Sequence, residues 1–470
     1  MENKAELERM IRSLVMEIAG QPTVTPPSSE AVPGEPGVFT TVAAAVAAAK
    51  EAQHKFEECT LATRSKAIEA IRTGMRPLVN KLAEMTYEET GMGRVADKVI
   101  KLNLTIDKTP GVEDLITECE TGDNGMTLYE LSPYGVIGAV TPSTNPSETL
   151  ICNSIGMLAA GNAVMFSVHP GAKHVSRWLI GQLNNIVTEA IGIPNLLVTI
   201  AEPSIEAAQE MMTHPDISLL VVTGGPGVVH QALCSGKKVI GAGAGNPPAF
   251  VDETANIKKA AQDIVMGASF DNNILCIAEK SVVAIRSIAD ELTAEMVKAG
   301  CILIEDQKTI DTLLALTLQA NGTPNRKFVG RNAGVILKAA GINVEGDPRL
   351  IIVRTDKHHP FATTEMLMPI LPIVTVDSFE DGLATALFLE NGLHHTATMH
   401  SLNMERLNKM ARAMKTSIFV KNGPSYAGLG FNGEGTTTFT IATPTGEATT
   451  TARHFARRRR CCLTTGFQIR

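Results

Sequence analysis

Cys276 is the residue of this sequence whose surroundings best suit covalent chemistry. It ends the polar segment Ser-Phe-Asp-Asn-Asn-Ile-Leu-Cys (269–276), which follows the small residues Gly267 and Ala268 and is typical of an accessible turn. A thiolate in such a turn can attack a carbonyl carbon and hold the product as a thioester. Most cysteines are nevertheless inert core residues. The local residues alone therefore favour an inert Cys276.

Two glycine-rich turns could approach a dinucleotide. Residues 223–227 (TGGPG) close an apolar strand, and residues 241–245 (GAGAG) precede Asn-Pro-Pro. Neither is a G-x-G-x-x-G turn with an acidic residue about 20 positions later, so the ordinary fingerprint is not met. Ligands of parallel sheets sit at the carboxyl ends of the strands, where these turns fall. These residues alone are equally compatible with a plain turn and with a turn that binds a cofactor.

Two other clusters suggest less specific roles. His394, His395 and His400 are too loosely spaced to predict a metal site, and we expect none. The run Arg457–Arg460 is typical of a solvated face or an intersubunit ion-pair site.

The composition is that of an ordinary globular protein. The 470 residues predict two or three packed units. A formal net charge of −7 and an aromatic content of 4% speak against nucleic-acid binding. The eight cysteines form no C-x-x-C pair, no signal peptide precedes the chain, and no apolar run reaches the roughly 18 residues of a membrane span. We expect a cytoplasmic protein that binds neither nucleic acid nor membranes.

The elements that would position these residues alternate along the chain. After a helical stretch over 42–89, apolar strands are expected at 136–140, 163–168, 196–201, 219–223 and 238–241. Helices are expected between them at 146–160, 171–191, 204–214 and 226–234. Continuous apolar strands with intervening helices predict a parallel sheet in an α/β fold. A second α/β unit is expected over 255–430.

Both ends of the chain carry segments that need partners. Residues 7–18 place apolar side chains on one stripe of a helix, and a Pro-rich linker to residue 37 is expected to be extended and mobile. Such a tethered helix favours targeting or partner binding, with docking on its own oligomer as the alternative. Residues 126–131 and 436–445 are strand-like arms that would need a partner sheet.

The sequence resembles the aldehyde dehydrogenase superfamily, and within it the CoA-acylating propionaldehyde and acetaldehyde dehydrogenases of bacterial microcompartments. The propionaldehyde branch is the more similar one. Two departures are Ala448, where a glycine is expected, and the pair Cys461-Cys462, where one cysteine is usual. The matching segments are TPSTNP (141–146), VHPGAK (168–173), TGGPG (223–227), GAGAGNPP (241–248), FDNNILCIAEK (270–280), TEMLMPILP (364–372), GLHHTATMH (392–400) and TSIFVKNGPSYAG (416–428).

The resemblance implies a division of the chain. Residues 1–19 would be an encapsulation helix, 20–37 a linker, 38–245 a Rossmann-like NAD/CoA-binding domain and 246–435 an α/β catalytic domain. Residues 118–132 and 436–470 would form a small β arm for oligomerisation into a dimer or tetramer. The expected location is the lumen of a bacterial microcompartment, with shell proteins or co-encapsulated enzymes as partners of residues 1–19.

The resemblance also assigns the chemistry, a ping-pong oxidation of propionaldehyde or another short aldehyde with NAD and CoA. Cys276 would be the nucleophile, and Asn145 would stabilise the oxyanion together with the Cys276 N–H. His395 matches a histidine that could deprotonate CoA, although a structural histidine is equally compatible. The residues implied in cofactor binding are Thr141, Pro142, Ser143, His169, Pro170, Gly171, Gly224, Gly225, Val228, Gly243, Glu365 and Leu367.

The expected acyl acceptor follows from a missing carboxylate. Hydrolytic members of the superfamily carry a general-base glutamate 34 positions before the cysteine, and here that position is Ala242. Without a base to activate water, a thiol should outcompete hydrolysis. The alternatives are a hydrolytic aldehyde dehydrogenase that receives a carboxylate from elsewhere, and a scaffold or cargo adaptor without catalysis. Retention of Cys276, Asn145 and Glu365 argues against the adaptor.

Overall fold

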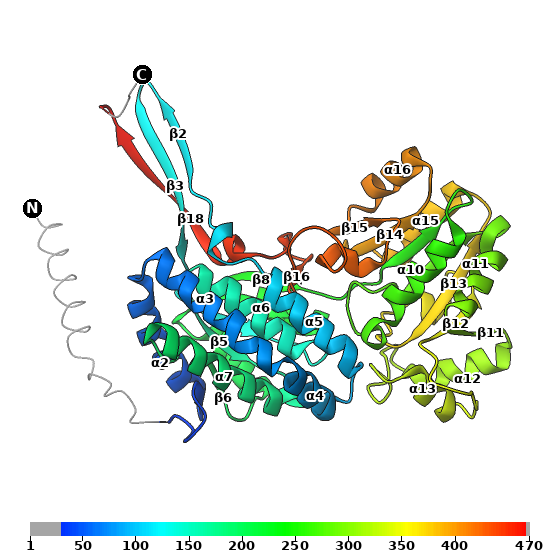
Figure 1. Ribbon diagram of the computed structural model, residues 1–470, viewed down its shortest axis with the longest axis horizontal. Coiled ribbons are helices and arrows are strands. Elements are labelled where there is room, and N and C mark those ends of the chain that lie inside the picture. The colour runs from blue at the N-terminus through cyan, green and yellow to red at the C-terminus, as the bar shows by residue number, and fades with distance from the viewer. Residues whose placement is uncertain (1–29, 467–470) are drawn as a thin grey trace, which may run out of the picture.

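Two parallel sheets with helices packed against them form the body, and a three-stranded antiparallel arm projects from it (Figure 1). The structure, a computed structural model, describes residues 30–466. The expected encapsulation helix (1–19) and the first part of the linker lie outside the described residues. Among residues 30–466, no helix is long and apolar enough to cross a membrane.

The first sheet has six parallel strands in the order β1-β6-β5-β4-β7-β8. Its strands are β1 (Val38–Phe39), β4 (Val136–Val140), β5 (Ala163–Ser167), β6 (Leu197–Ile200), β7 (Ile217–Thr223) and β8 (Lys238–Ala242). Its helices are α2 (Val42–Glu57), α3 (Leu61–Met75), α4 (Val79–Thr90), α5 (Val95–Lys108), α6 (Pro146–Ala159), α7 (Lys173–Ile191), α8 (Ile205–Thr213) and α9 (Pro226–Leu233). The strand order reverses direction between β4 and β7, which is where such sheets bind ligands.

The second sheet has seven parallel strands in the order β11-β12-β13-β10-β9-β14-β15. Its strands are β9 (Pro248–Val251), β10 (Ser281–Ile285), β11 (Cys301–Ile304), β12 (Leu350–Thr355), β13 (Ile370–Val376), β14 (Thr396–His400) and β15 (Ile418–Lys421). Its helices are α10 (Ile257–Ser269), α11 (Arg286–Lys298), α12 (Gln307–Thr317), α13 (Ala333–Ala339), α14 (Pro360–Thr363), α15 (Phe379–Glu390) and α16 (Met404–Met414). Each sheet has its own apolar core.

The arm is an antiparallel sheet of β2 (Glu118–Gly122), β3 (Gly125–Pro133) and β18 (Ala456–Thr464). The strand-like segment 126–131 lies in β3 and pairs within its own chain. The strand expected over 436–445 is wrong in extent, because only Ile441–Ala442 (β16) pairs there, with Ala448–Thr449 (β17). Residues 437–442 are instead buried against the body. The arm's third strand is the basic run, where Arg458 lies 3.7 Å from the Tyr129 ring centroid.

The end of the expected linker is ordered, which corrects the prediction of a mobile segment for residues 30–37. The N–H of Val32 donates to the Val38 carbonyl at 2.8 Å, which folds these residues back into a turn. Glu35 pairs with Arg177 of α7 at 2.6 Å. Pro33, Gly34 and Pro36 are exposed, and they belong to a hydrogen-bonded turn rather than a free tether.

Candidate active site

Cys276 lies in a loop between α10 and β10 with an unusual backbone. Asp271, Asn272 and Asn273 have φ angles of 48°, 54° and 66°, a left-handed run that Asp and Asn tolerate better than other side chains. All three are buried, and the Asn273 amide donates to the carbonyls of Ala268 at 2.7 Å and Glu279 at 3.0 Å. The loop is therefore held rigidly, and Cys276 keeps partial exposure at its end.

The buried Lys280 side chain is hydrogen-bonded to this loop. Its ammonium donates to the Asn273 carbonyl at 2.7 Å, the Asn273 Oδ1 at 2.6 Å and the Leu275 carbonyl at 2.9 Å. Burial lowers the pKa of Lys280 to about 8. Burial raises the pKa of the Cys276 thiol to about 12, with Glu365 adding to the rise and Lys280 opposing it. The thiol is therefore protonated at neutral pH in the free chain, and Lys280 is the cation that favours its ionisation.

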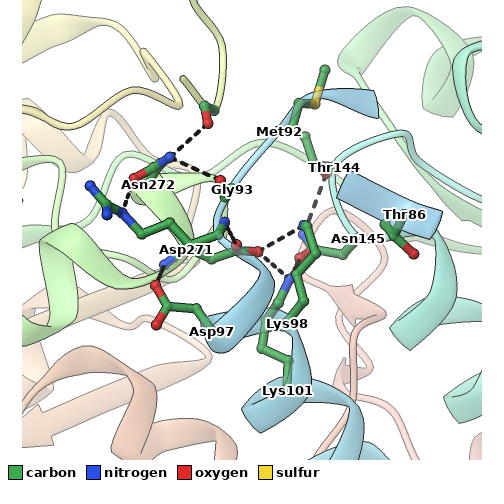
Figure 2. Close-up of polar contacts among 12 residues, drawn as sticks. Thr86, Met92, Gly93, Asp97, Lys98, Lys101, Thr144, Asn145, Asp271 and Asn272 are labelled. Carbon is green, nitrogen blue, oxygen red and sulfur yellow. Dashed lines mark hydrogen bonds and ion pairs between the residues drawn. The ribbon is translucent and has the colours of Figure 1, made fainter. Parts of the chain in front are cut away.

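Asn145 reaches this region from the first sheet. It caps α6, directly before Pro146, at the end of the turn that follows β4. Its Oδ1 accepts from the Lys101 ammonium at 2.6 Å, whereas its Nδ2 lies 3.4 Å from Thr144 Oγ1 (Figure 2). The amide N–H groups are thus directed away from Lys101, which leaves a donor for a ligand.

A buried ion network joins the two parts of the site (Figure 2). Lys101 pairs with Asp271 at 2.6 Å and with Glu148 at 2.9 Å, and Lys98 pairs with Asp271 at 3.2 Å. Burial alone would raise the pKa of Asp271, but Lys101 and Lys98 hold it below its usual range. The carboxylate therefore stays ionised, and α5 is tied to the loop that carries Cys276.

The glycine run after β8 passes directly beside Cys276. A Cβ atom at Gly245 would lie 2.7 Å from the Cys276 carbonyl oxygen and 2.8 Å from His395 Cγ. The Gly245 N–H donates to Glu365 Oε1 at 3.2 Å. Gly245 is therefore the point where Cys276, His395 and Glu365 meet.

His395 is buried and neutral. Burial lowers its pKa to about 4, with a further contribution from Lys280. Its Nδ1 lies 2.9 Å from Thr396 Oγ1, and its Nε2 has no hydrogen-bond partner among the described residues. Buried polar atoms are rarely left unpaired in native proteins, so a free Nε2 beside the cysteine loop indicates that a ligand or water completes it.

The remaining candidate residues lie at the carboxyl edge of the first sheet. The turns concerned follow adjacent strands, in the order β5, β4, β7 and β8. Thr141 Oγ1 is buried without a partner among the described residues, and a Cβ at Gly225 would meet only open space. The candidates that follow these strands are Thr141, Pro142 and Ser143 after β4, His169, Pro170 and Gly171 after β5, Gly224 and Gly225 after β7 with Val228 in the first turn of α9, and Gly243 after β8.

Comparisons with known proteins identify the family of this chain. Residues 37–440 match the aldehyde dehydrogenase family. The chain belongs to the aldehyde dehydrogenase family. It is 54% identical to the CoA-propanoylating propanal dehydrogenase of Salmonella typhimurium, with 100% of both chains covered.

Solved structures of acylating aldehyde dehydrogenases share the fold. The Rhodopseudomonas palustris propionaldehyde dehydrogenase with bound CoA and an acylated cysteine has a TM-score of 0.91 at 50% identity, over 92% of this chain and 99% of that one. The propionaldehyde dehydrogenase of the Clostridium phytofermentans fucose utilisation microcompartment has a TM-score of 0.91 at 48% identity, over 93% and 100%. The expected α/β fold of the family, with its parallel sheets, is confirmed.

The edge residues of this aldehyde dehydrogenase fit a dinucleotide. Thr141, whose hydroxyl has no partner among residues 30–466, and Gly225, beside open space, lie in the turns after the two strands that flank the reversal of the sheet. Burial and Arg326 lower the pKa of His169, so its imidazole is neutral, and its Nδ1 accepts from the Gly171 N–H at 3.0 Å. Leu367 has a left-handed φ of 53°, which is strained for a leucine and typical of functional sites.

Several residues of the site escaped the sequence reasoning. Lys101, Glu148 and Lys280 are buried charges that no local pattern distinguishes from surface residues of a helix or turn. Gly245 was part of a recognised glycine run, but its packing against Cys276 depends on a strand order that the sequence does not state. The signal that could have been used is Asp271-Asn272-Asn273, because three consecutive Asp or Asn residues favour left-handed turns.

The departure at Ala448 also has a structural counterpart. Its φ is 56°, a conformation that glycine adopts freely and alanine does not. Cys461 and Cys462 lie exposed on β18, and all eight cysteines are free.

Proposed function

We propose that this chain is an NAD-dependent, CoA-acylating aldehyde dehydrogenase that converts propionaldehyde or another short aldehyde to its acyl-CoA through a thioester on Cys276. The single observation that carries this is the convergence of Cys276, Glu365 and His395 on Gly245. Full-length similarity to a CoA-propanoylating enzyme supports the acyl acceptor.

The first half-reaction uses the cysteine loop and Asn145. The Cys276 thiolate attacks the aldehyde carbon, and the carbonyl electrons move to oxygen, giving a thiohemiacetal alkoxide. The Asn145 Nδ2 and the Cys276 N–H would donate hydrogen bonds to that oxygen, as in an oxyanion hole. NAD supplies the acceptor for the hydride that leaves the same carbon, so that an acyl thioester on Cys276 remains.

Burial raises the pKa of Cys276 to about 12, so in the first turnover the thiol proton must pass to water before attack. In later turnovers Cys276 is already released as a thiolate. Lys280 favours the thiolate, whereas Glu365 opposes it. Glu365 would oppose the thiolate less if its carboxylate turned away from Cys276 to hold the cofactor. Glu365 would then contact the nicotinamide ribose, as the family resemblance implies. Ionisation of Cys276 would thereby be coupled to occupation of the site.

The second half-reaction uses His395. The CoA thiol attacks the thioester carbon, Cys276 leaves as a thiolate, and the CoA proton passes to His395 Nε2, which is neutral and has no partner among the described residues. Hydrolysis is the competing outcome. Ala242 carries no carboxylate that could activate water. Glu365 does carry one, its charge acts on the Cys276 thiol, and it is the group that could act as general base for a water molecule. Turnover with and without CoA distinguishes the two acceptors.

Residues of the sheet edge would hold the cofactor. Thr141, Pro142 and Ser143, with Gly224, Gly225 and Val228, flank the β4–β7 reversal, and His169, Pro170, Gly171 and Gly243 lie on either side. Gly225 leaves room for close backbone approach, and Thr141 Oγ1 has no partner among the described residues. NAD rather than NADP fits a neutral His169.

Mass spectrometry of the intact protein tests the acyl-enzyme. Incubation with propionaldehyde and NAD, without CoA, should add one propionyl group to the wild type, and CoA should remove it as propionyl-CoA. Cys276→Ser should gain no stable thioester. His395→Ala should acylate at the wild-type rate but discharge to CoA more slowly by about 10²-fold, the usual scale of a general base. Equal slowing of both steps would assign His395 a structural role.

The outer segments suggest a location and an assembly. Residues 1–19 would bind shell proteins or co-encapsulated enzymes in the lumen of a cytoplasmic microcompartment. Removing residues 1–29 should leave catalysis intact and abolish co-purification with compartments; loss of activity would contradict this. The long exposed β18 edge of the arm favours pairing with a second copy into dimers or tetramers. Deletion of residues 456–470 should then reduce the number of chains per particle, as measured by light scattering.

A further inference from the structure

The orientation of the Asn145 amide is set by Lys101. The Lys101 ammonium lies 2.6 Å from Asn145 Oδ1, and an ammonium can only donate. The amide oxygen must therefore face Lys101, and the two N–H groups must face the opposite side. The contact of Nδ2 with Thr144 Oγ1, at 3.4 Å, is too long to fix the amide by itself.

Lys101 is in turn held on two sides. Its ammonium contacts Glu148 at 2.9 Å, three residues after Asn145 on α6. It also contacts Asp271, five residues before Cys276, at 2.6 Å (Figure 2). The side chains of Lys101, Glu148 and Asp271 are at most 1% exposed. A buried, charge-assisted network of this kind is short and directional. It links the amide donor of one unit to the nucleophile loop of the other.

We infer that Lys101 is a positioning residue for the oxyanion site, which holds the Asn145 N–H groups toward the reacting carbonyl and ties them through Asp271 to the Cys276 loop. The inference rests on the proposed function in one respect, that Asn145 donates to the oxyanion. The hydrogen bond to Oδ1 also polarises the amide, which strengthens its N–H groups as donors.

A double-mutant cycle with p-nitrophenyl acetate tests this. The Cys276 thiolate attacks the ester carbonyl and releases p-nitrophenolate, with neither NAD nor CoA, so the result does not depend on the proposed acyl acceptor. Burst amplitude counts competent sites, and the burst rate constant reports stabilisation of the oxyanion. Asn145→Ala should slow the burst about 10²–10³-fold, the usual loss for one such donor.

The test variant is Lys101→Met with Glu148→Gln, which removes one buried cation and one buried anion together and so leaves no added net charge. With Asn145 present, this variant should slow the burst at least about 10-fold. With alanine at position 145 it should slow the burst less than about 3-fold, because the effects of mutating two residues that share one interaction do not add. Iodoacetamide alkylation of Cys276, which develops no oxyanion, should keep its rate.

The matched control is Lys98→Met with Glu148→Gln. It removes the same kinds of charge from the same two helices, but the Lys98 ammonium bonds Asp271 rather than the Asn145 amide. Because Lys101 still donates to Asn145 Oδ1 in this variant, its losses with asparagine and with alanine at position 145 should differ by less than about 3-fold. The inference is overturned if the Lys101 variant also slows both backgrounds by one factor, or if it slows alkylation as much as the ester burst.

The two proposals fail separately. A wild type that shows the ester burst and the expected cycle but makes no acyl-CoA would keep the positioning role and refute the acyl acceptor. If the wild type makes propionyl-CoA but the Lys101 variant slows the burst by the same factor with and without Asn145, the acyl acceptor would stand and the positioning role would be refuted.

Discussion

Gly245→Ala should disable the site through space alone. The φ angle of Gly245 lies outside the left-handed region, so alanine is not excluded by the backbone. Its methyl group would nevertheless lie 2.7 Å from the Cys276 carbonyl oxygen and 2.8 Å from His395 Cγ. The first contact is about 0.7 Å shorter than the 3.4 Å at which ordinary contact begins. Both neighbours are backbone or buried ring, so the cysteine loop must move.

The size of the effect follows from that displacement. A shift of about 1 Å at reacting atoms can cost about 10²-fold in rate. Displacing the cysteine loop by the roughly 0.7 Å of this overlap should therefore lower kcat/KM by about 10–10²-fold. Overpacking a buried site costs about 1–3 kcal/mol of unfolding free energy. The rate loss should exceed what the small fraction of unfolded protein explains.

The assay combines NADH formation with chemical denaturation. The matched control is Gly122→Ala in the arm, where an added Cβ meets no atom of residues 30–466 within 4 Å and φ is not left-handed. The control should keep both activity and stability. Wild-type kcat/KM in Gly245→Ala would refute the packing of the glycine run against Cys276, as would an equal loss in the control.

Three further changes test the electrostatics and the backbone. Lys280→Met should slow iodoacetamide alkylation of Cys276 at pH 8 by about 10-fold or more, because it removes the cation that lowers the pKa of the thiol, and one pKa unit is tenfold in thiolate; an unchanged pH profile would contradict this. Burial raises the pKa of Glu279 to about 7, so the folded state binds a proton that the unfolded state has lost, and the free energy of unfolding should fall by about 3 kcal/mol as the pH rises from about 4.5 to 7. Glu279→Gln should flatten that slope in urea titrations, and an undiminished slope would place its cause elsewhere. Ala448→Gly should raise the unfolding free energy by about 0.5–1 kcal/mol, because glycine has no Cβ to strain the backbone at a φ of 56°. A loss of stability would mean that the alanine methyl group packs favourably.

The sheet strands could be predicted because their signal is local. Apolar runs at 136–140, 163–168, 196–201, 219–223 and 238–241 correspond to β4, β5, β6, β7 and β8 within two residues at each end. Buried parallel strands are continuously apolar, and the helices between them have caps and breaks in the sequence. Since all of these strands run in parallel, the turns that follow them could be placed at one edge of the sheet from the sequence alone.

The tail and the linker could not be predicted in the same way. The Thr-rich segment 436–445 has high strand propensity, but burial against the body decides its conformation, and Thr440 bonds Thr223 at 2.9 Å. The charged run 457–460 forms a strand because β3 offers it a partner edge and Tyr129 offers it an aromatic face. Tertiary contacts override local preference in both places.

The candidate site divides along the same line. Cys276, Asn145, His395 and Glu365 were found by resemblance, which transfers residue by residue along motifs. The groups that hold them, Lys101 above all, act through contacts between segments that lie far apart in sequence. Sequence patterns carry no information on which buried lysine meets which amide.

NADH formation from propionaldehyde and NAD, with and without CoA, on the wild type and Cys276→Ala is the most direct test of the account. CoA-dependent turnover that yields propionyl-CoA and is abolished in Cys276→Ala is the predicted result. Undiminished turnover without CoA that yields propionate would show that water is the acceptor and would contradict the argument from Ala242.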